Sequence, residues 1–387
     1  MVSRAPPPAI LLVLLCFVFA ACSMPAYDPP GGQTRASYDP YLDGWRPASW
    51  IPFCVADTIT DFAFGNGRYV AVSATGVIGW SDDGDRWFRA ATDLTVSNFN
   101  AVAFGGGVFV AAGNGGVFAN SLNGEHWIVR TEMDGFDGLD ITGVAYGDGR
   151  FVAVGGLRRV PTIGGGSVPG SPRIAHSVNG IDWTGETPSG FGAERLNGVD
   201  FGRVFVGTAG NYEYRFFAVG DGGRRGWTRN PAAGWSFQGP TAPIGTANIT
   251  AVTVGNRGVD ERGNPGVGIG VAFGDGRTAI ATQPDTFAGF DADLRTFLFY
   301  LPPNIQEPWV RVRALKNVIV YAGGYFVAAG TGAMIGFWPS AEPSRDSQRF
   351  WRALTFPEFM LWEITAVAAL NGRFFVGNVG GRIGHGR

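Results

Sequence analysis

The sequence predicts an all-β protein, a seven-bladed β-propeller whose blades are four-stranded antiparallel sheets and whose last blade is closed by an N-terminal strand. Three observations predict this fold: one phrase recurs along the chain, its clear copies contain a glycine turn between apolar runs, and a second motif ending in tryptophan follows the first three copies. The composition suits it, because 61 of 387 residues are glycine while 30 Phe and 12 Trp supply bulky core side chains.

Residues 1–21 predict an export signal. Arg4 precedes an apolar run, Ile10 to Ala21, that is too short to span a bilayer as a helix. The run ends in Phe19-Ala20-Ala21-Cys22, which resembles the lipobox of bacterial lipoproteins, although Phe19 stands where that family usually has Leu. The resemblance implies that the signal is cleaved before Cys22 and that its sulfur carries lipid. The alternative left open is a plain secretory signal with an incidental cysteine.

Residues 22–41 predict a flexible tether between this anchor and a domain that spans residues 42–387. The stretch after Cys22 is rich in proline and glycine, which is typical of solvated linkers. Ser23 follows the cysteine, whereas an Asp there would resemble the inner-membrane retention signal of enteric bacteria. We therefore expect an exported chain, lipid-anchored at Cys22 to the bacterial cell envelope and located at the outer membrane. Cys54 is expected to be a buried, inert thiol.

The recurring phrase sets the number of blades. The clear copies are ITDFAFGNGRYVAV from Ile59, FNAVAFGGGVFVAAG from Phe99 and ITGVAYGDGRFVAVG from Ile141. Weaker copies begin at Leu196, Ile249, Lys316 and Ile364. The spacing of 40 to 67 residues fits four short strands per unit with loops of variable length. Six or eight blades stay open, because the fourth to sixth copies are eroded.

Each clear copy has the pattern of a β-hairpin. Apolar residues such as Val70 and Val72 alternate with a period of two, and Asn66-Gly67 and Asp148-Gly149 stand between the runs. Asn-Gly and Asp-Gly accept the positive φ angles of a type I′ turn, whose twist suits the flanking strands. The glycines do not predict a phosphate site, because no helix follows to offer its N-terminus.

A second motif, S-x-[DN]-G-x-x-W, follows the first three copies. It resembles the Asp-box, or BNR repeat, of sialidase-like β-propellers, but is one residue shorter than the usual spacing of that family. Its residue types predict a structural role, because Ser and Asp or Asn can bond the backbone of a tight turn while Trp fills space against the neighbouring unit. The box residues are Ser81, Asp83, Gly84, Trp87, Ser121, Asn123, Gly124, Trp127, Ser177, Asn179, Gly180 and Trp183.

The two ends of the domain are expected to share one blade. The last copy reaches the C-terminus with enough residues for three strands but without a box or an outer strand. Asp43-Gly44-Trp45-Arg46-Pro47 resembles the end of a box followed by an outer strand, so residues 42–50 are expected to complete the seventh blade. The alternative left open is a decorated linker beside an incomplete blade.

Loop positions divide the candidate binding residues between two faces. In propellers the loops between the second and third strands and the connections between blades share one face, which we call the first face. The insertion Leu157 to Arg173, the acidic connection after the second blade and the connection before the last copy belong there, and they make it the expected binding face. The candidate ligand or partner residues are Arg158, Arg159, Asp134, Asp137, Glu358, Phe359 and Trp362.

The opposite face is expected to carry two long insertions. These are Asn256 to Gly268 and Ala288 to Pro308, and the second contains the apolar run Phe297 to Leu301. An exposed apolar patch of this kind would suit a partner, whereas a segment folded back over the ring would act as a plug. Both interpretations stay open.

Charge and residue types narrow the function. A formal net charge of -2 argues against nucleic acid, and the scattered His126, His176 and His385 predict neither a metal site nor a cofactor. The resemblance to sialidases implies an arginine trio, a tyrosine nucleophile and a paired glutamate, and no such spacing is visible. The leading hypothesis is a monomeric, non-enzymatic binding or assembly scaffold for a protein partner. The alternative is a glycan-binding or glycan-cleaving propeller.

Overall fold

The computed structural model places all its described residues in the compact unit that spans residues 39–387. The expected signal, tether and Cys22, together with Cys54, lie outside them. The described residues are 46–47, 57–96, 98–136, 138–157, 160–161, 167–168, 171–205, 212–241, 244–259, 265–274, 277–281, 295–296, 298–300, 309–311, 314–322, 325–330, 334–339, 352–355 and 363–386.

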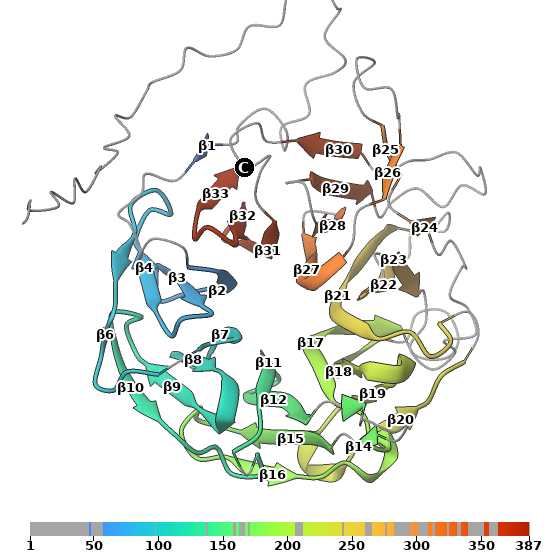
Figure 1. Ribbon diagram of the computed structural model, residues 1–387, viewed down its shortest axis with the longest axis horizontal. Helices are drawn as coiled ribbons and strands as arrows, with labels where there is room; N and C mark the ends of the chain where they lie inside the picture. The colour runs from blue at the N-terminus through green and yellow to red at the C-terminus, as the bar shows by residue number, and fades with distance from the viewer. Residues whose placement is uncertain are drawn as a thin grey trace, which may run out of the picture. The chain divides into compact units, whose positions relative to one another are not determined.

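Small antiparallel sheets radiate from a common centre, so the fold is an all-β propeller with four-stranded blades (Figure 1). We name each blade by its innermost strand. The β2 blade consists of β2 (Ile59–Gly65), β3 (Arg68–Ser73), β4 (Ile78–Ser81) and β5 (Phe88–Arg89). The β7 blade consists of β7 (Ala101–Gly105), β8 (Val108–Ala112), β9 (Phe118–Ser121) and β10 (His126–Arg130). The β11 blade consists of β11 (Ile141–Gly147), β12 (Arg150–Leu157), β15 (Ser171–Ser177) and β16 (Thr184–Glu186).

The remaining blades follow in chain order. The β17 blade consists of β17 (Leu196–Phe205), β18 (Tyr212–Gly220), β19 (Arg225–Thr228) and β20 (Ser236–Gln238). The β21 blade consists of β21 (Ile249–Val259), β22 (Pro265–Phe273), β23 (Arg277–Ala281) and β24 (Arg295–Thr296). The β27 blade consists of β27 (Ala314–Ala322), β28 (Tyr325–Gly330), β29 (Met334–Pro339) and β30 (Arg352–Thr355).

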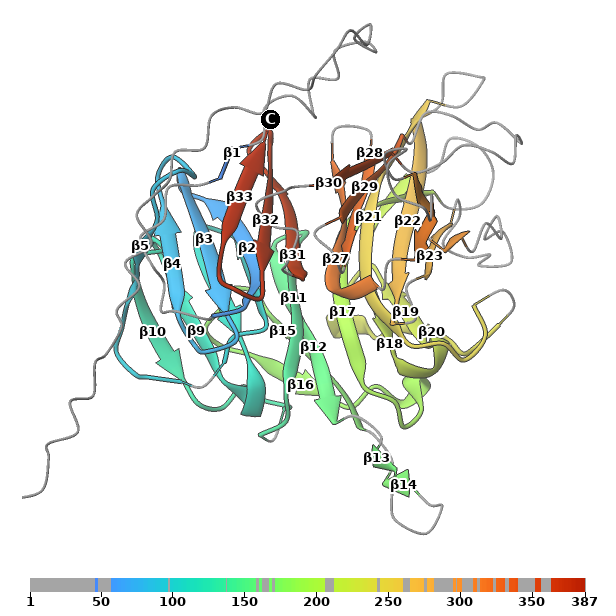
Figure 2. The same ribbon diagram turned by 45° about the horizontal axis from the view of Figure 1, so that its top comes forward.

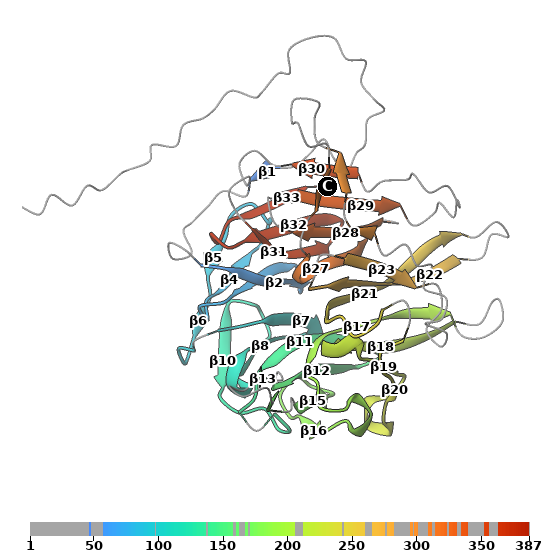
Figure 3. The same cartoon turned by 45° about the vertical axis from the view of Figure 1, so that its right-hand side comes forward.

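Strands from both ends of the described chain form the β31 blade. It consists of β31 (Ile364–Leu370), β32 (Arg373–Asn378), β33 (Ile383–Gly386) and β1 (Arg46–Pro47). β1 lies beside β33 and pairs with it antiparallel, with Arg46 opposite His385 and Pro47 opposite Gly384 (Figure 1 and Figure 3). Of residues 42–50, expected to complete the last blade, these two are the ones that the structure describes.

The hairpin turns follow the sequence prediction. Asn66, Asp148 and Asn371 have φ angles of 48°, 46° and 49°, and the glycine after each also has a positive φ. Two successive residues with positive φ are what a type I′ turn requires.

One side chain links each of five innermost strands, β2, β7, β11, β17 and β31, to the next blade. Thr60, the second residue of β2, donates its Oγ1 hydrogen to the carbonyl of Phe99, just before β7, at 2.8 Å. Asn100 donates to the carbonyl of Ile141 at 2.7 Å. The same bond runs from Thr142 to Leu196, from Asn197 to Ile249 and, across the junction of the chain ends, from Thr365 to Ile59. A repeated position in the phrase therefore sets the register between blades.

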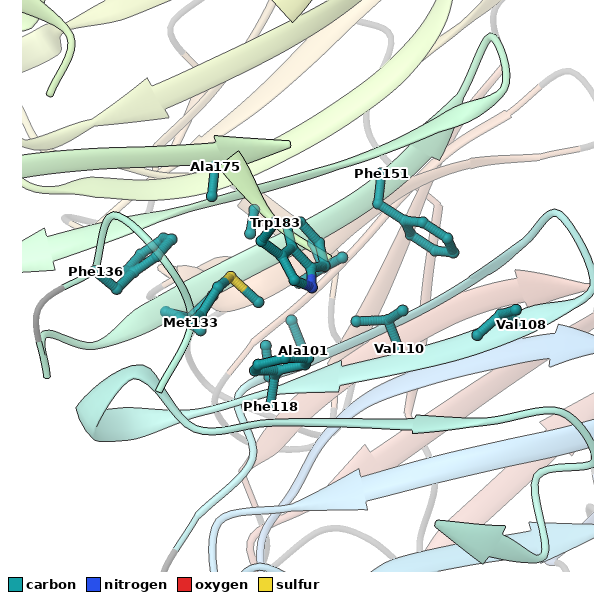
Figure 4. Packing of buried hydrophobic residues seen from close by; sticks show 13 residues of the cluster. Ala101, Val108, Val110, Phe118, Met133, Phe136, Phe151, Ala175 and Trp183 are labelled. Carbon is teal, nitrogen blue, oxygen red and sulfur yellow. The ribbon is translucent and has the colours of Figure 1, made fainter. Parts of the chain in front are cut away.

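Apolar side chains fill the space between adjacent blades. Figure 4 shows the cluster between the β7 and β11 blades, where Phe118 and Phe151 lie on either side of Trp183. Trp183 and Phe118 are 6.1 Å apart between ring centroids, close to edge-on. Met133 and Phe136, from the connection between these blades, lie at the end of the cluster away from Val108 (Figure 4).

The connections also cover the outer edges of the blades that follow them. β6 (Ala91–Thr92), which comes after β5, pairs in parallel with β10 and adds a fifth strand to the β7 blade. Farther along, Asp134 accepts a hydrogen bond from the backbone N–H of Gly185 in β16. A covered edge cannot recruit a strand from another chain, so these contacts protect the two blades from edge pairing.

Two hairpins lie outside the blades. β13 (Val160–Pro161) pairs with β14 (Ser167–Val168) in the first-face insertion and extends past the end of β12 (Figure 2). β25 (Leu298–Tyr300) pairs with β26 (Trp309–Arg311). From the sequence, the segment 288–308 is expected as a loop on the opposite face. Part of it is strand: residues 295–296 form β24, the outer strand of the β21 blade, and residues 298–300 form β25. None of the helices formed by the described residues has the length and apolar character needed to cross a membrane.

Replacement of Thr365 tests the link at the junction of the chain ends. Thr365→Val keeps the shape of the side chain but removes the hydroxyl and leaves the Ile59 carbonyl without this donor, so we expect a loss of about 1–2 kcal/mol in the free energy of unfolding. Chemical denaturation measures it. Thr365→Ser retains the hydroxyl and should stay near wild type, and equal stability of all three proteins would contradict the role of the bond.

Asp200 gives the stability a pH dependence. Burial raises the pKa of Asp200 from 3.8 to about 6, although the backbone N–H of Val254 donates to its Oδ2 at 2.8 Å. A carboxyl group with a raised pKa stabilises the folded state below its unfolded pKa, and this contribution disappears as the pH rises through the folded pKa. As the pH rises from about 4 to about 6, the free energy of unfolding of wild type should fall by at most about 3 kcal/mol relative to that of Asp200→Asn. Chemical denaturation at each pH measures this difference. A constant difference across this range would contradict the prediction.

Candidate functional site

The first face is defined by contacts between turns and blade connections. The turn after β8 contains the 3-10 helix η1 (Asn114–Gly116), and the backbone N–H of Gly115 donates to the Asp140 carboxylate of the connection that follows the β7 blade. The turn after β18 contains η3 (Asp221–Gly223), and the N–H of Gly222 donates to the side-chain oxygen of Asn248. Turns and connections therefore lie on the same face.

The two turns have the same conformation. Gly115 has φ 68° and ψ 25°, and Gly222 has φ 65° and ψ 25°. The glycine after each also has a positive φ, which side chains rarely adopt, so the sequences Gly-Asn-Gly-Gly and Gly-Asp-Gly-Gly suit this backbone. The β7 and β17 blades thus present equivalent turns, each bonded to the connection beyond it.

Polar side chains connect these turns into one continuous rim. We call this set the polar rim: it extends over the first face from the β7 blade to the β21 blade, and neighbouring members are joined by hydrogen bonds, an ion pair or a shared turn. Its members are Asn98, Asn100, Asn114, Asp140, Arg195, Asn197, Asp221 and Asn248.

Three amides form the first part of the polar rim. The backbone N–H of Asn114 donates to the side-chain oxygen of Asn98 at 3.2 Å. The amide nitrogen of Asn100 donates to the side-chain oxygen of Asn114 at 2.8 Å. Asn114 is exposed and Asn98 is half-buried, so these amides lie at the surface while their oxygens are fixed from within the protein.

An ion pair and a buried amide bond form the centre of the polar rim. Arg195 lies 3.9 Å from the Asp140 carboxylate and donates from Nε to the side-chain oxygen of Asn197 at 3.3 Å. Asn197 donates to the Asp221 carboxylate at 2.8 Å. Asp140 remains 43% exposed in its side chain, so the pair is near solvent and contributes little to stability.

A buried arginine holds the loops beneath the far end of the polar rim. Arg225 is 1% exposed, and burial lowers its pKa to about 10. Its guanidinium donates to the carbonyl of Gly223 at 3.1 Å, to the carbonyl of Gly239 at 3.2 Å and to the hydroxyl of Thr241 at 2.6 Å. These bonds join the η3 turn to the connection that leads to Asn248. Residue types alone gave no sign of this role, because Arg225 occupies a strand position where other copies have an apolar residue.

The box motifs form closed turns on the opposite face. In the first box the Ser81 hydroxyl accepts the backbone N–H of Gly84 at 2.8 Å, and Asp83 Oδ1 accepts the N–H groups of Asp85 and Arg86, both at 2.8 Å. Trp87 donates from Nε1 to the Gly84 carbonyl. The second box repeats this set, and the third repeats its backbone bonds. Within the boxes, the serine and the Asp or Asn are occupied by turn bonds.

The charge state of Asp83 follows from the same bonds. Burial raises the pKa of this carboxyl group, but hydrogen bonds from the N–H groups of Arg86 and Asp85 and from the Ser81 hydroxyl favour the charged form and lower it overall. Asp83 is therefore a charged acceptor that organises the turn.

Arginines at the hairpin turns connect the first and second boxes to the preceding blade. Arg373, just after its hairpin turn in the β31 blade, donates to the backbone carbonyl of Asp83 at 2.6 Å. Arg68 donates in the same way to the carbonyl of Asn123, and Arg150 to the side-chain oxygen of Asn230. The repeated Asn-Gly-Arg and Asp-Gly-Arg sequences carried this signal, but their geometry was needed to show the partner.

The candidate residues from the sequence fall in different places. Asp134 is exposed at the outer edge of the β11 blade, where it bonds Gly185, and it is not part of the polar rim. The other candidate ligand residues lie outside the described part of the chain: Arg158, Arg159, Asp137, Glu358, Phe359 and Trp362. Within the described ranges, no group of three or more His, Cys, Asp or Glu side chains could hold a metal ion.

Solved structures of other propellers resemble this chain. YCF48 from Cyanidioschyzon merolae aligns with a TM-score of 0.52 at 15% identity, over 89% of this chain and 98% of that chain. The WD40 β-propeller domain of Doa1 aligns with a TM-score of 0.54 at 12% identity, over 89% and 97%. YCF48 bound to D1 peptide aligns with a TM-score of 0.52 at 14% identity, over 90% and 97%. No family model and no curated protein matches the sequence. At these identities the likeness defines the class by fold alone: a β-propeller.

Replacement of Ser81 tests the box. Ser81→Ala leaves the buried N–H of Gly84 without its acceptor, so we expect a loss of about 1–2 kcal/mol in the free energy of unfolding, measured by chemical denaturation. Asn123→Asp in the second box is the control. It introduces the residue type that the first box has at this position, so it should leave stability nearly unchanged. A Ser81→Ala protein as stable as wild type would contradict the interpretation.

Proposed function

We propose that this chain is an envelope protein, lipid-anchored at Cys22, whose seven-bladed propeller binds a protein partner at the first face as a non-enzymatic scaffold. The observation that carries the proposal is the polar rim. It keeps the exposed amides of Asn114 and Asn248 and the partly exposed carboxylate of Asp140 at the surface, bonded to neighbouring turns and connections. A fixed polar surface of this extent is what a protein segment needs for recognition.

A neighbour by fold supports a peptide ligand. The structure of YCF48 bound to D1 peptide shows a propeller of comparable length with a peptide partner. The glycan alternative would require a pair of free carboxylates for cleavage. In the polar rim Asp140 accepts a backbone N–H and Asp221 accepts the Asn197 amide, which favours binding over hydrolysis.

Strand pairing supports the proposed number of blades. The described strands pair into six four-stranded sheets and one five-stranded sheet, apart from the two hairpins outside the blades. The innermost strands contact one another in the order β2, β7, β11, β17, β21, β27, β31 and back to β2.

The anchor is tested by labelling. Cells that make the chain are fed an alkyne-tagged palmitate, and the protein is isolated from membrane and soluble fractions. We expect label and membrane recovery for wild type and loss of both in Cys22→Ser, because two or more acyl chains are needed for durable attachment. Equal labelling of the two proteins would contradict lipidation at this cysteine.

The binding face is tested by site-specific photocross-linking in intact cells. A photoreactive side chain replaces Thr246, which is exposed near Asn248 on the first face, or Leu122, which is 69% exposed in a box on the opposite face. We expect a discrete protein adduct from position 246 and none from position 122. Adducts from position 122 alone, or from neither position, would contradict the proposed binding face.

A further inference from the structure

Three amide groups of the polar rim have their oxygens bonded within the protein and their NH₂ groups directed elsewhere. The Asn98 oxygen accepts the backbone N–H of Asn114, and the Asn248 oxygen accepts the backbone N–H of Gly222. A backbone N–H can only donate, so the accepting atom of each side chain must be oxygen. The orientation of both amides is therefore fixed by the bonds themselves.

The third amide is that of Asn114, and its orientation is fixed by Asn100. Asn100 uses its nitrogen to donate to the carbonyl of Ile141 at 2.7 Å and to Asn114 at 2.8 Å. Because the Ile141 carbonyl can only accept, the bonded atom of Asn100 is its NH₂ group, and the bonded atom of Asn114 is then its oxygen. Asn114 and Asn248 are both exposed. Neither they nor Asn98 donate an NH₂ hydrogen to any residue that the structure describes.

These NH₂ groups are preorganised donors. Each side chain is already held by a bond to its oxygen, so a ligand that accepts from the nitrogen would not have to immobilise a free side chain, which lowers the entropic cost of binding. Asn114 and Asn248 belong to equivalent turns of the β7 and β17 blades or to the connections bonded to them. The donors are thus distributed along the polar rim and are not gathered at one point.

A ligand that meets all these donors offers neutral acceptors at separated points of the first face. An extended peptide does so, because its main-chain carbonyls point alternately to its two sides, so each side presents one at every second residue of a chain that rises about 3.3 Å per residue. The donors are uncharged, so they select for acceptors without demanding an acidic side chain. The carboxylates of Asp140 and Asp221 disfavour a strongly anionic ligand in the same region.

We propose that the polar rim binds an extended peptide segment of a protein partner through its main-chain carbonyl oxygens, which accept hydrogen bonds from the NH₂ groups of Asn98, Asn114 and Asn248. This inference rests on the proposed function and specifies the ligand of the same face. It also means that recognition depends only weakly on the side chains of the bound segment.

Exchange of oxygen for NH₂ tests the donors without disturbing the turns. In the rim variant, Asn114→Asp with Asn248→Asp, the carboxylates still accept the N–H of Gly222 and the Asn100 amide, but both donors are lost. The control, Asn123→Asp with Asn230→Asp, adds the same charge on the opposite face, where the Asn230 oxygen accepts from Ala232 and Arg150. Asn114→Ala with Asn248→Ala removes the donors without adding charge.

The probe is a displayed library of random linear peptides of twelve residues, selected on the wild-type domain with its chain ends intact. Selected peptides are then synthesised as amides and as analogues with single backbone esters, whose carbonyls are weaker acceptors. We expect the Asp pair and the Ala pair at positions 114 and 248, together called the rim variants, to weaken peptide binding about tenfold or more, as the loss of two hydrogen bonds implies. The control should bind within about twofold of wild type. Esters at some positions should also weaken binding, whereas side-chain alanine substitutions should mostly be tolerated.

The outcomes separate this inference from the proposed function. Selected peptides that bind the rim variants as well as wild type, or an empty selection, would overturn the carbonyl-binding proposal. A glycan-array signal abolished by the rim variants, with no peptide selected, would overturn it in favour of a sugar ligand. If the adduct from position 246 still forms in any of these cases, protein binding at the first face stands and only the mode of recognition is wrong.

Discussion

The structure depends on one hydrogen bond that is repeated at five of the junctions between blades. A Thr or Asn at the second position of the recurring phrase donates to the carbonyl that begins the next innermost strand, at 2.6 to 2.9 Å. Apolar packing between blades is strong but not directional, and alone it would allow neighbouring sheets to slide. A buried donor and acceptor that must meet remove this freedom, since leaving either unpaired costs about 1–3 kcal/mol.

The same register determines what the two faces can do. On the opposite face, the serine and the Asp or Asn of each box bond the backbone of their own turn, and Arg373 and Arg68 join the first and second boxes to the preceding blade. That face holds the blades together. On the first face, fixed innermost strands bring each turn against the next connection, so Gly115 meets Asp140 and Gly222 meets Asn248. Polar groups of these turns and connections, such as Asn114 and Asn248, are thereby held at the surface.

Two ionisable side chains, Asp200 and Arg225, are buried within the blades. Asp200 is a carboxyl group enclosed between two innermost strands, and its raised pKa of about 6 reflects the cost of burying charge there. Burial likewise disfavours the charged form of Arg225 and lowers its pKa. Its hydrogen bonds join the η3 turn to the connection before Asn248. Both groups lie where neighbouring copies have small or apolar residues, so they belong to single blades and are not features that the repeat requires.

The sequence by itself determined the all-β propeller, the positive-φ hairpin turns and the composition of the boxes, because these depend on local patterns: alternation, Asn-Gly or Asp-Gly dipeptides, and short-range bonds within a turn. It did not determine the polar rim. Asn98, Asn114 and Asn248 have no distinctive spacing in the chain, whereas Asp134, which looked suited to a ligand, bonds the outer strand of a blade. Only the tertiary structure decided which side chains share a face, because that depends on turns and connections from different blades meeting at a register that sequence neighbours do not set.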